Sequence, residues 1–571
     1  MQKKRWKLRP ALEPQEQIIE RSRKYGIPPL VASILSKRGV LDLNEYIVPG
    51  LDKLYDPFLM KDMEQAVKRI VSAIQNKETV YVYGDYDVDG ITSTAILTHF
   101  LRSQGVPASY YIPDRLQEGY GVNCNAIEEI AARGATLLIT VDCGISSVNE
   151  VEKAKTVGLD VIITDHHECK DVLPDAIAVL NPKRPDCDYP FKQLAGVGVV
   201  FKLLQALFIE LKIHMQTLFD AYLDITAIGT VADVMPLMSE NRMILKNGLE
   251  RLTYTENKGL KALIQQADIG ANPITAGTIG FVLAPRINAA GRVGDPKCAV
   301  ELLLSEVDKS AEEYALFLDE SNRSRQNSEQ DIFKEALAML EGDPQLKEEA
   351  VIVLAHEEWH HGIIGIVASK ITERFHKPCI LISLDETTGK GSGRSIKNFN
   401  LFTALSECQE HLVKFGGHEL AAGLTVARDQ IELFRQKINA YAKEVLQPED
   451  YIPEIVIDAE LPISYLNLNT IDKIAVMAPY GMGNASPVFV CRNLRVTAVR
   501  LLSEGKHIKL TLSDGRCTIN AIGFSMGELG KTIGTKDMVD IVFSLDSNVY
   551  HGERQAQILL KDVRPAAAKL S

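Results

Sequence analysis

The sequence predicts a multidomain α/β protein built from a doubly wound parallel sheet, a long connecting helix, a second α/β domain and a C-terminal β-barrel. Three observations support this fold class. Strands and helices alternate between residues 78 and 167, residues 296–346 read as a charge-rich helix with no glycine until Gly342, and short alternating strands follow residue 452. A chain of 571 residues also exceeds one ordinary core, so several domains are expected.

The first predicted domain repeats one strand-helix unit. Its strands are near-continuous runs of Val, Ile and Leu, which is the pattern of strands buried on both faces of a parallel sheet. The helices between them are amphipathic, as crossover connections require. The predicted strands cover residues 78–85, 108–114, 136–142 and 160–167, and the predicted helices cover residues 91–105, 125–134 and 146–158.

Composition narrows the classes of function. A net charge of −12 argues against a protein that coats nucleic acid nonspecifically, although it leaves room for a local basic groove. No run of about 18 apolar residues occurs, and the basic start MQKKRWKLRP lacks the apolar stretch of a signal peptide. Nine cysteines without a C-x-x-C pair indicate reduced thiols and no structural zinc. We therefore expect a cytoplasmic protein that does not enter a membrane.

Acidic residues and histidines gather where the predicted strands end. In chain order they are Asp85, Asp87, Asp89, Asp142, Asp165, His166, His167 and, closing a further apolar segment, Asp233. Ligands of doubly wound sheets bind at the carboxyl ends of the strands. Crowded carboxylates repel unless a cation lies among them, and carboxylates with one or two imidazoles suit Mn²⁺ or Mg²⁺. The sequence therefore predicts a metal centre, in which one bridging carboxylate can hold two ions.

Each motif alone has a structural alternative. The DxDxDG run could form a calcium loop, but position 12 counted from Asp85 is Ile96, where such a loop needs Glu, and a strand precedes it. Asp142 could cap the following helix, and the Asp-His-His triplet could form a solvated turn. The occurrence of all three motifs at successive strand ends of one sheet favours the metal centre.

Four motifs, in this order, resemble those of the DHH phosphoesterase superfamily: DYDVDG, VDCG, TDHH and VADV. Further segments resemble one branch of that superfamily, the bacterial 5′→3′ exonucleases specific for single-stranded DNA. These segments are PPLVASILSKRG, PDRLQEGYG, APRINAAGR, GSGRS, FGGHELAAG and PYGMGNASPVF. The resemblance extends from about residue 5 to residue 565, which is nearly the whole chain.

The resemblance implies a set of metal ligands and catalytic residues. Two ions, Mn²⁺ or Mg²⁺, would be held by Asp85, Asp87, Asp89, Asp142, His166 and Asp233. Asp142 would bridge the ions and His167 would face the scissile phosphate, while Asp165 would orient the histidines. Asp85 could instead lie outside the coordinating set, because other superfamily members place a His nearby where this chain has Tyr83.

The resemblance also implies substrate-binding residues in two domains and in the connecting helix. They are Arg115, Arg286, Asn288, Arg292, Gln326, Ser392, Arg394, Gly416, Gly417 and His418. Gly-rich turns can approach a phosphate closely, and an arginine fork with a hydroxyl offers several donors to its oxygens. Arg115, Arg292 and the pair Ser392 and Arg394 are therefore candidates for reading a 5′-terminal phosphate. Each arginine could instead form an ordinary salt bridge between lobes.

The C-terminal strands are separated by the turn signals SEGK, SDGR and YHGER, which suggests a five-stranded barrel of the oligonucleotide-binding type. A purely structural β-module is the alternative. The predicted organisation is an N-terminal extension packing on the catalytic domain (1–75), the DHH catalytic domain (76–295), the connecting helix (296–346), a DHHA1-type substrate-binding domain (347–448) and the barrel (449–571).

The resemblance implies a monomeric, metal-dependent exonuclease that degrades single-stranded DNA from the 5′ end to mononucleotides, in DNA repair and recombination. A helicase and a single-strand-binding protein are the expected protein partners. Two alternatives stay open: a superfamily phosphodiesterase for short oligonucleotides or cyclic dinucleotides, and a noncatalytic strand-binding relative. The additional domains argue against the first alternative, and the filled motif positions argue against the second.

Overall fold

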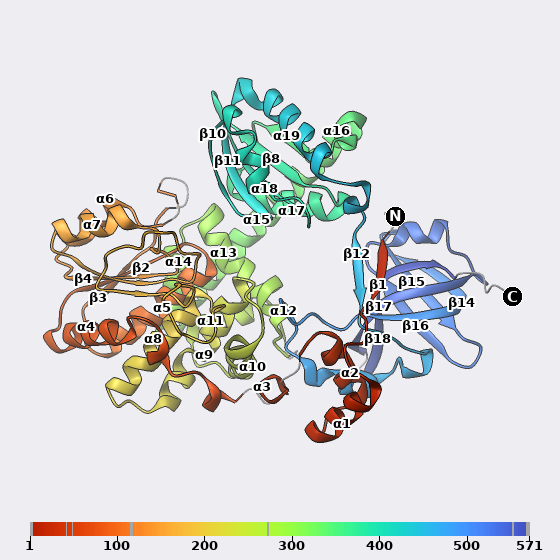
Figure 1. Cartoon of the computed structure of the whole chain (residues 1–571), viewed down its shortest axis with the longest axis horizontal. Helices are drawn as coiled ribbons and strands as arrows, with labels where there is room; N and C mark the ends of the chain where they lie inside the picture. The colour runs from red at the N-terminus through yellow and green to blue at the C-terminus, as the bar shows by residue number, and fades with distance from the viewer. Residues whose placement is uncertain are drawn as a thin grey trace. The chain divides into compact units, whose positions relative to one another are not determined.

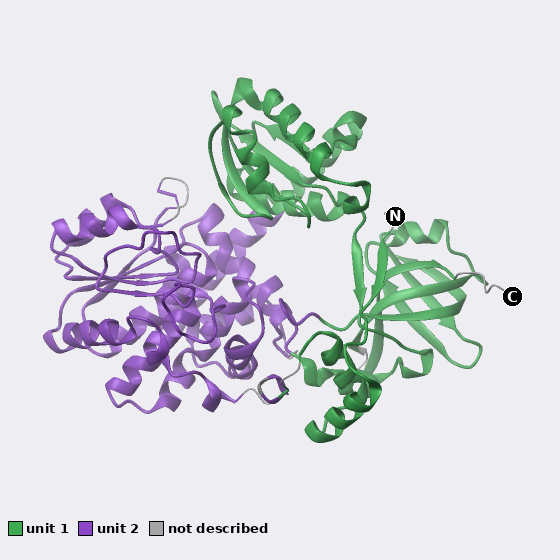
Figure 2. Cartoon of the chain, in the orientation of Figure 1, with its two compact units in different colours: residues 1–43, 327–478, 486–571 green, residues 44–326, 479–485 purple. Residues whose placement is uncertain are grey.

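The computed structural model describes residues 4–40, 43–47, 50–114, 118–119, 121–270, 273–550 and 553–566. The chain divides into two compact units, coloured separately in Figure 2. Unit 2 contains residues 44–326 and 479–485, and unit 1 contains residues 1–43, 327–478 and 486–571. Both units are therefore discontinuous in sequence, and each is described by itself.

Unit 2 is built on a parallel sheet and its crossover helices (Figure 1). The strands are β2 (Val80–Gly84), β3 (Ala108–Tyr111), β4 (Leu137–Val141), β5 (Asp160–Thr164) and β6 (Ala178–Leu180). The helices are α3 (Asn44–Ile47), α4 (Met63–Asn76), α5 (Val88–Ser103), α6 (Cys124–Ala132), α7 (Val148–Thr156), α8 (Gly196–Glu210), α9 (Met215–Ala232), α10 (Ser239–Thr253), α11 (Lys258–Gln266), α12 (Ala276–Thr278), α13 (Ala284–Val293) and α14 (Lys297–Leu304). The predicted strands and crossover helices are confirmed, and β6 is an addition.

The order of the strands determines where a ligand can bind. The order is β3-β2-β4-β5-β6, and every neighbouring pair is parallel. The chain runs from β2 outward to β3 and then returns to the other side of β2 to form β4, so the direction of winding reverses between β2 and β4. A crevice forms at the carboxyl ends of such a pair, because the loops that follow the two strands diverge. Asp85 follows β2 and Asp142 follows β4, so both lie at this crevice.

Helices cover both faces of this sheet, as the doubly wound prediction requires. On one face Val80, Val82 and Ile139 are buried in a core to which α5 and α8 contribute. On the other face Tyr83 and Leu138 are buried with side chains of α6 and α7. Because successive strand residues point to opposite faces, burial of both sets explains the near-continuous apolar strands.

The connecting helix is α15 (Asp308–Gly342), which is 35 residues long and runs from unit 2 into unit 1. It starts later than the predicted residue 296, because α14 is a separate helix that ends at Leu304. The end at Gly342 fits the sequence, since glycine is a poor helix former and stands next to Asp343 and Pro344.

Unit 1 contains a second, mixed sheet. Its strands are β7 (Ile352–His356), β8 (Cys379–Leu384), β9 (Thr388–Arg394), β10 (Leu412–Gly417) and β11 (Ala421–Ala427), and its helices are α16 (Pro344–Glu348), α17 (His361–Phe375), α18 (Leu401–Ser406) and α19 (Ile431–Val445). The strand order is β10-β11-β9-β8-β7, in which only β7 and β8 are parallel.

The glycine-rich motifs of this domain lie on strands, which corrects the expectation that they form turns. GSGRS ends β9 and FGGH ends β10. A Cβ at Gly391 would lie 2.8 Å from Leu424, and one at Gly393 would lie 2.7 Å from Leu401. These two glycines therefore allow close packing within the sheet domain, a requirement that the sequence alone did not distinguish from a phosphate-binding turn.

The C-terminal part of unit 1 is a closed barrel, as predicted. Its strands are β14 (Phe489–Leu502), β15 (His507–Ser513), β16 (Thr518–Gly523), β17 (Met538–Tyr550) and β18 (Glu553–Pro565), preceded by β12 (Glu454–Ile457), β13 (Ala459–Glu460) and α20 (Leu468–Ile474). The barrel order is β14-β15-β16-β18-β17, and pairing of β14 with β17 closes it. Closure satisfies the strand edges that an open sheet would expose.

The N-terminal segment is divided between the two units, which differs from the expected packing of residues 1–75 on the catalytic domain. Residues 1–43 belong to unit 1, where β1 (Arg5–Leu8) pairs in parallel with β12. After α1 (Gln15–Tyr25) and α2 (Pro29–Lys37), the Arg38 guanidinium donates to both carboxylate oxygens of buried Asp458, at 2.9 and 2.7 Å. Two-point recognition of this kind ties the segment to the start of the barrel domain.

Helices that could cross a membrane are absent from the part of the chain that the structure describes.

Candidate metal centre

The DYDVDG motif forms a tight loop between β2 and α5. Asp87 caps α5, because its Oδ1 accepts hydrogen bonds from the backbone N–H groups of Asp89, at 2.9 Å, and Gly90, at 3.1 Å. A Cβ at Gly90 would lie 2.4 Å from the carbonyl oxygen of Asp85, so only glycine allows this closeness. The loop thus brings three carboxylates together at the end of one strand.

Asp89 is fixed by the start of another helix. Its Oδ2 accepts from the N–H of Gly196 and its Oδ1 accepts from the N–H of Val197, both at 2.7 Å, at the N-terminus of α8. The partial positive charge of a helix N-terminus stabilises a carboxylate at this position. The two hydrogen bonds hold Asp89 in the interior, where its side chain is almost fully buried.

Asp142, directly after β4, adopts an uncommon backbone conformation with φ of +59°. A Cβ at Gly196 would lie 2.6 Å from Asp142 Oδ1, so the carboxylate lies directly against the first turn of α8. Left-handed conformations outside glycine cost free energy and occur where a site imposes them. We infer that the αL conformation serves to aim this carboxylate into the crevice.

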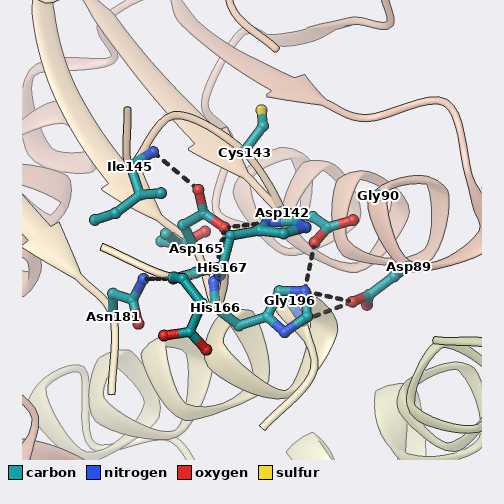
Figure 3. Close-up of polar contacts among 12 residues, drawn as sticks. Asp89, Gly90, Asp142, Cys143, Ile145, Asp165, His166, His167, Asn181 and Gly196 are labelled. Carbon is teal, nitrogen blue, oxygen red and sulfur yellow. Dashed lines mark hydrogen bonds and ion pairs between the residues drawn. The ribbon is translucent and has the colours of Figure 1, made fainter. Parts of the chain in front are cut away.

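His166 faces three of the carboxylates. Its Nε2 lies 3.1 Å from Asp142 Oδ1, 3.5 Å from Asp233 Oδ2 and 3.8 Å from Asp89 Oδ2, and Figure 3 shows the imidazole directed at Asp89 and Asp142. Asp233 arrives from outside the sheet, as the residue that ends α9. The end of helix α9 therefore brings a carboxylate to the predicted ligands that lie at the strand ends and in the first turn of α5.

Both carboxylate oxygens of Asp165, the first residue of the triplet, accept hydrogen bonds from groups of the protein (Figure 3). Its Oδ1 accepts from the backbone N–H groups of His166 and His167, at 2.7 and 3.1 Å, and lies 2.7 Å from His167 Nδ1. Its Oδ2 accepts from the N–H of Ile145 at 2.8 Å. These bonds orient the imidazole of His167 and hold the backbone of His166.

Burial and like charge raise the pKa values of the facing carboxyls. Burial, then the charge of Asp87, raises the pKa of Asp89 to about 7, and burial with the charges of Asp89 and Asp87 raises the pKa of Asp233 to about 9. Burial, and to a smaller extent the charges of four neighbouring carboxylates, hold the pKa of Asp142 well above its usual range. Without a cation, this centre therefore disfavours full ionisation of its acids.

The two histidines are shifted in opposite directions. Burial, then the charge of His167, lowers the pKa of His166 to about 3, so its imidazole is neutral and can act as a metal ligand. Burial opposes protonation of His167 as well, but the hydrogen bond and charge of Asp165 outweigh it and raise the pKa of His167 to about 9. In the metal-free centre, the protonated form of His167 is therefore favoured at neutral pH.

The donor set fits divalent cations. Three groups have ligand atoms within 4.8 Å of one another: Asp85, Asp87 and Asp142; Asp89, His166 and Asp233; and Asp142, His166 and His167. His166 Nε2 and Asp233 Oδ2 are buried and lie 3.5 Å apart, and Nε2 is also 3.1 Å from Asp142 Oδ1, but among the described residues these two atoms make no well-aligned hydrogen bond. Buried polar atoms in this condition call for a further partner. Carboxylate oxygens with one neutral imidazole are the ligands that Mn²⁺ and Mg²⁺ prefer.

Sequence reasoning missed the residues that support these ligands. Asn181, which follows β6, donates from Nδ2 to the carbonyl of His167 at 2.9 Å, and is completely buried. The N–H groups of Gly196 and Val197 hold Asp89, as described above. The signals were present, since Asn-Pro follows a short apolar run and GVG opens an apolar helix, but neither pattern alone indicates a metal centre.

Three predicted substrate residues lie on α13 of unit 2, and a fourth lies on α15. Arg286 donates from Nε to buried Asp319 at 3.0 Å, so an ion pair within the unit accounts for this arginine. Asn288 lines a groove on the same helix, and Gln326 is exposed on α15. A Cβ at Gly291 would lie 2.7 Å from the carbonyl of Tyr86, so the end of α13 that carries Arg292 packs on the DYDVDG loop.

The remaining predicted substrate residues lie in unit 1, apart from Arg115, which falls outside the described residues. Ser392 and Arg394 are neighbours on β9, where Arg394 Nη1 lies 3.2 Å from Ser392 Oγ. Both lie against α17, because a Cβ at Gly365 would come within 2.8 Å of Ser392 Oγ and 3.1 Å of Arg394 Nη2. Gly416, Gly417 and His418 are exposed at the end of β10.

This fold and this centre define a phosphoesterase of the DHH class. Residues 79–230 match the sequence pattern described as the DHH family, N-terminal domain, residues 348–444 match the DHHA1 domain, and residues 457–562 match the RecJ OB domain. The three matches fall on the parallel-sheet domain, the mixed-sheet domain and the barrel.

Comparison with individual proteins identifies the family within this class. The single-stranded-DNA-specific exonuclease RecJ of Bacillus subtilis is 41% identical over 98% of this chain and 71% of its own length, and that of Escherichia coli is 35% identical over 94% and 96%. The crystal structure of RecJ in complex with Mn²⁺ from Thermus thermophilus superposes with a TM-score of 0.86 at 30% identity, over 99% of this chain and 80% of that one. The chain belongs to the RecJ family.

Proposed function

We propose that this chain is a metal-dependent exonuclease that hydrolyses single-stranded DNA from the 5′ end. The observation that carries the proposal is that two of the three groups of candidate ligands share Asp142, in a chain of the RecJ family. The related RecJ exonucleases are named as specific for single-stranded DNA, and the related Thermus structures contain Mn²⁺ or Mg²⁺. Degradation to mononucleotides, use in repair and recombination, a cytoplasmic location, a monomeric state, and helicase and single-strand-binding partners are parts of this proposal.

Two ions would be held by Asp85, Asp87, Asp89, Asp142, His166 and Asp233, with Asp142 shared between them. When bound, divalent cations in such a centre activate water and neutralise charge on a phosphoryl group. Side chains of the protein supply the remaining catalytic groups. Asp165 and Asn181 hold His167 in place, and the imidazolium of His167 offers a proton and a positive charge to the phosphate or the leaving oxygen.

The experiment that tests the function uses one oligonucleotide labelled at either end. With Mn²⁺ or Mg²⁺ we expect a 5′-labelled strand to release its label as a mononucleotide from the first moments of the reaction. A 3′-labelled strand should instead shorten progressively. A blunt duplex of the same sequence serves as the control and should resist. Release of the 3′ label first would contradict the polarity, and equal digestion of the duplex would contradict the strand specificity.

Recognition of the 5′ end must come from groups other than the metal ligands, because a metal centre hydrolyses a phosphodiester regardless of which end is near. We assign this role to Ser392 and Arg394, with Arg115 and Arg292 as further candidates. Arg394 and Ser392 together present a guanidinium and a hydroxyl beside the first turns of α17, whose N-terminus favours anions.

Arg394→Ala should reduce the preference for 5′-phosphorylated over 5′-hydroxyl strands by about 10- to 150-fold, since charged hydrogen bonds contribute roughly 1.5–3 kcal/mol. Initial rates on both substrates measure the effect. Arg428→Ala removes an equal charge from an exposed arginine of the same domain, and should leave the preference unchanged. Equal slowing of both substrates by Arg394→Ala would show that Arg394 supports the fold and does not read the end.

A further inference from the structure

An aromatic side chain is exposed on unit 2, the unit that carries the metal centre. Phe281 lies in a π-helical turn, Ile279–Leu283, between α12 and α13, and its side chain is 86% exposed. Pro285 explains the irregular turn, because it has no N–H to donate to the carbonyl of Phe281 four residues earlier. Single π-turns often occur at functional sites, and a fully exposed phenyl ring needs a reason in a chain with ample core.

Phe281 borders a groove of about 320 Å³ on unit 2, here called the apolar groove. Its lining includes Val231, Val234, Asn288, Tyr480 and Met482. Two of its lining residues, Ala232 and Val234, flank Asp233 in the sequence. The apolar groove therefore begins at the backbone on either side of a predicted metal ligand.

The backbone at Val234 is strained in a way that serves both sites. Val234 has φ of +57°, an outlier for a β-branched residue, and its side chain is 58% exposed. This turn lets Asp233 remain at the metal centre while the next side chain joins the groove. Strain of this kind persists where the surroundings determine it, and it clusters at functional sites.

One part of the lining of the apolar groove is held in place by a backbone hydrogen bond and by close packing. Residues 479–485 form a clip that packs on unit 2, and the N–H of Leu237 donates to the carbonyl of Met482 at 2.8 Å. A Cβ at Gly481 would lie 2.5 Å from Leu237, so the clip fits closely. Met482, which is 54% exposed, is thereby fixed as a second exposed apolar side chain in the lining of the same groove.

The chemistry of the lining selects one kind of occupant. Among the described residues that line the groove none is charged, and Asn288 and Tyr480 carry its polar side-chain groups. Such a lining does not suit a phosphate or a charged peptide. A nucleobase has an apolar π-face and polar edges that match this lining, and a base bound beside the backbone of Asp233 would belong to a nucleotide near the phosphodiester at the metal centre.

We propose that the apolar groove binds a nucleobase of the single strand within one or two nucleotides of the scissile phosphodiester, with Phe281 stacked on the face of that base. This inference rests on the proposed function and adds a site that grips the strand through its bases. It accounts for binding without sequence preference, because every base has a π-face. It also gives the strand a second hold beside the contacts to phosphate.

The test combines variants of Phe281 with strands that lack one base. A 5′-phosphorylated oligo(dT) carries an abasic analogue at each of its first four positions in turn. For the wild type, we expect the single-turnover rate at subsaturating enzyme to fall by about 5- to 150-fold at one position, the range for loss of one stacked base. Phe281→Ala should slow cleavage of the intact strand similarly and show no further loss at that position. Phe281→Trp should restore the wild-type pattern.

Binding of the same strands in EDTA, measured by fluorescence anisotropy, should follow the same pattern without any cleavage. Tyr254→Ala is the matched control, because Tyr254 is another aromatic residue of unit 2, 79% exposed and outside the apolar groove. It should behave as the wild type. If Phe281→Ala lowers all rates equally and keeps the loss at one position, or has no effect, the inference is overturned while the proposed function stands. A wild-type protein that leaves the intact strand uncut would overturn both.

Discussion

Asp142→Asn is expected to lower the rate of cleavage of single-stranded DNA by at least about 10³-fold, because loss of a carboxylate that we propose to be shared by the ions would remove several kcal/mol of charge stabilisation. Asparagine keeps the size of the side chain and tolerates the left-handed backbone at this position, so the fold should be retained. Single-turnover rates with Mn²⁺ measure the loss, and circular dichroism checks the fold.

Two further results would support this reading of Asp142. Strand binding in EDTA should stay equal or become tighter, since a negative charge facing a polyanion is gone. The melting temperature in EDTA should not fall, because burial and neighbouring carboxylates disfavour ionisation of this acid. Asp142→Ala is a weaker variant for the purpose, since alanine adds about 1 kcal/mol of backbone strain in the left-handed region. Cleavage at the wild-type rate by Asp142→Asn would contradict a shared ligand.

Removal of divalent metal should abolish cleavage and lower the melting temperature of the catalytic domain, and the stabilisation by metal should grow with pH. The direction of this pH dependence follows from the raised pKa values of two carboxyl groups. In the folded protein without metal, the pKa of Asp89 is raised to about 7 and that of Asp233 to about 9, from an ordinary 3.8. Their contribution to stability is therefore complete below about pH 4, and is lost as pH rises through 7 and 9.

Bound metal reverses this trend, because its ligands must be deprotonated and protons compete with it at low pH. Melting temperatures with 1 mM Mg²⁺ and with EDTA, compared at pH 6, 7 and 8, should differ increasingly. Each tenfold gain in effective affinity adds about 1.4 kcal/mol, or roughly 2–5 °C for a domain of this size. Asp142→Asn provides the control and should show a smaller difference at every pH. A difference that is constant or shrinks as pH rises would contradict this electrostatic account.

The sequence was sufficient for the parts of the centre that depend on strand ends. The pattern of buried strands located Asp85 and Asp142, and the strand order explains why residues 57 positions apart meet. It was insufficient where tertiary contact decides. Nothing local to Asp233 shows that the end of α9 reaches His166, and nothing local to Gly196 shows that its N–H binds Asp89.

In the mixed-sheet domain, the sequence could not show which structural role each glycine has. A glycine is compatible with a phosphate-binding turn, with a positive φ, or with a neighbour too close for a Cβ, and only the structure separates these cases. Gly391 and Gly393 belong to the last kind, whereas Gly416 has no neighbour that a Cβ would meet. In the same way Phe281 reads as an ordinary core residue in IGFVLAPR, because the irregular turn that exposes it has no simple periodicity.

The clip at residues 479–485 constrains how this enzyme can be rearranged by recombination or by protein engineering. Arg242 lies 4.0 Å from the ring of Tyr46 and donates to the carbonyl of Pro479 at 3.5 Å, and Tyr46 donates to Asn484 Oδ1 at 2.7 Å. Catalytic unit and clip are therefore one folding module encoded in two separate stretches, with the mixed-sheet domain inserted between them. A chimera that exchanges only residues 44–326 would join the clip of one parent to the catalytic unit of another. Substitutions on the two sides of this contact should therefore occur together. Natural variation at Tyr46, Leu237 and Arg242 is expected to correlate with variation in the clip.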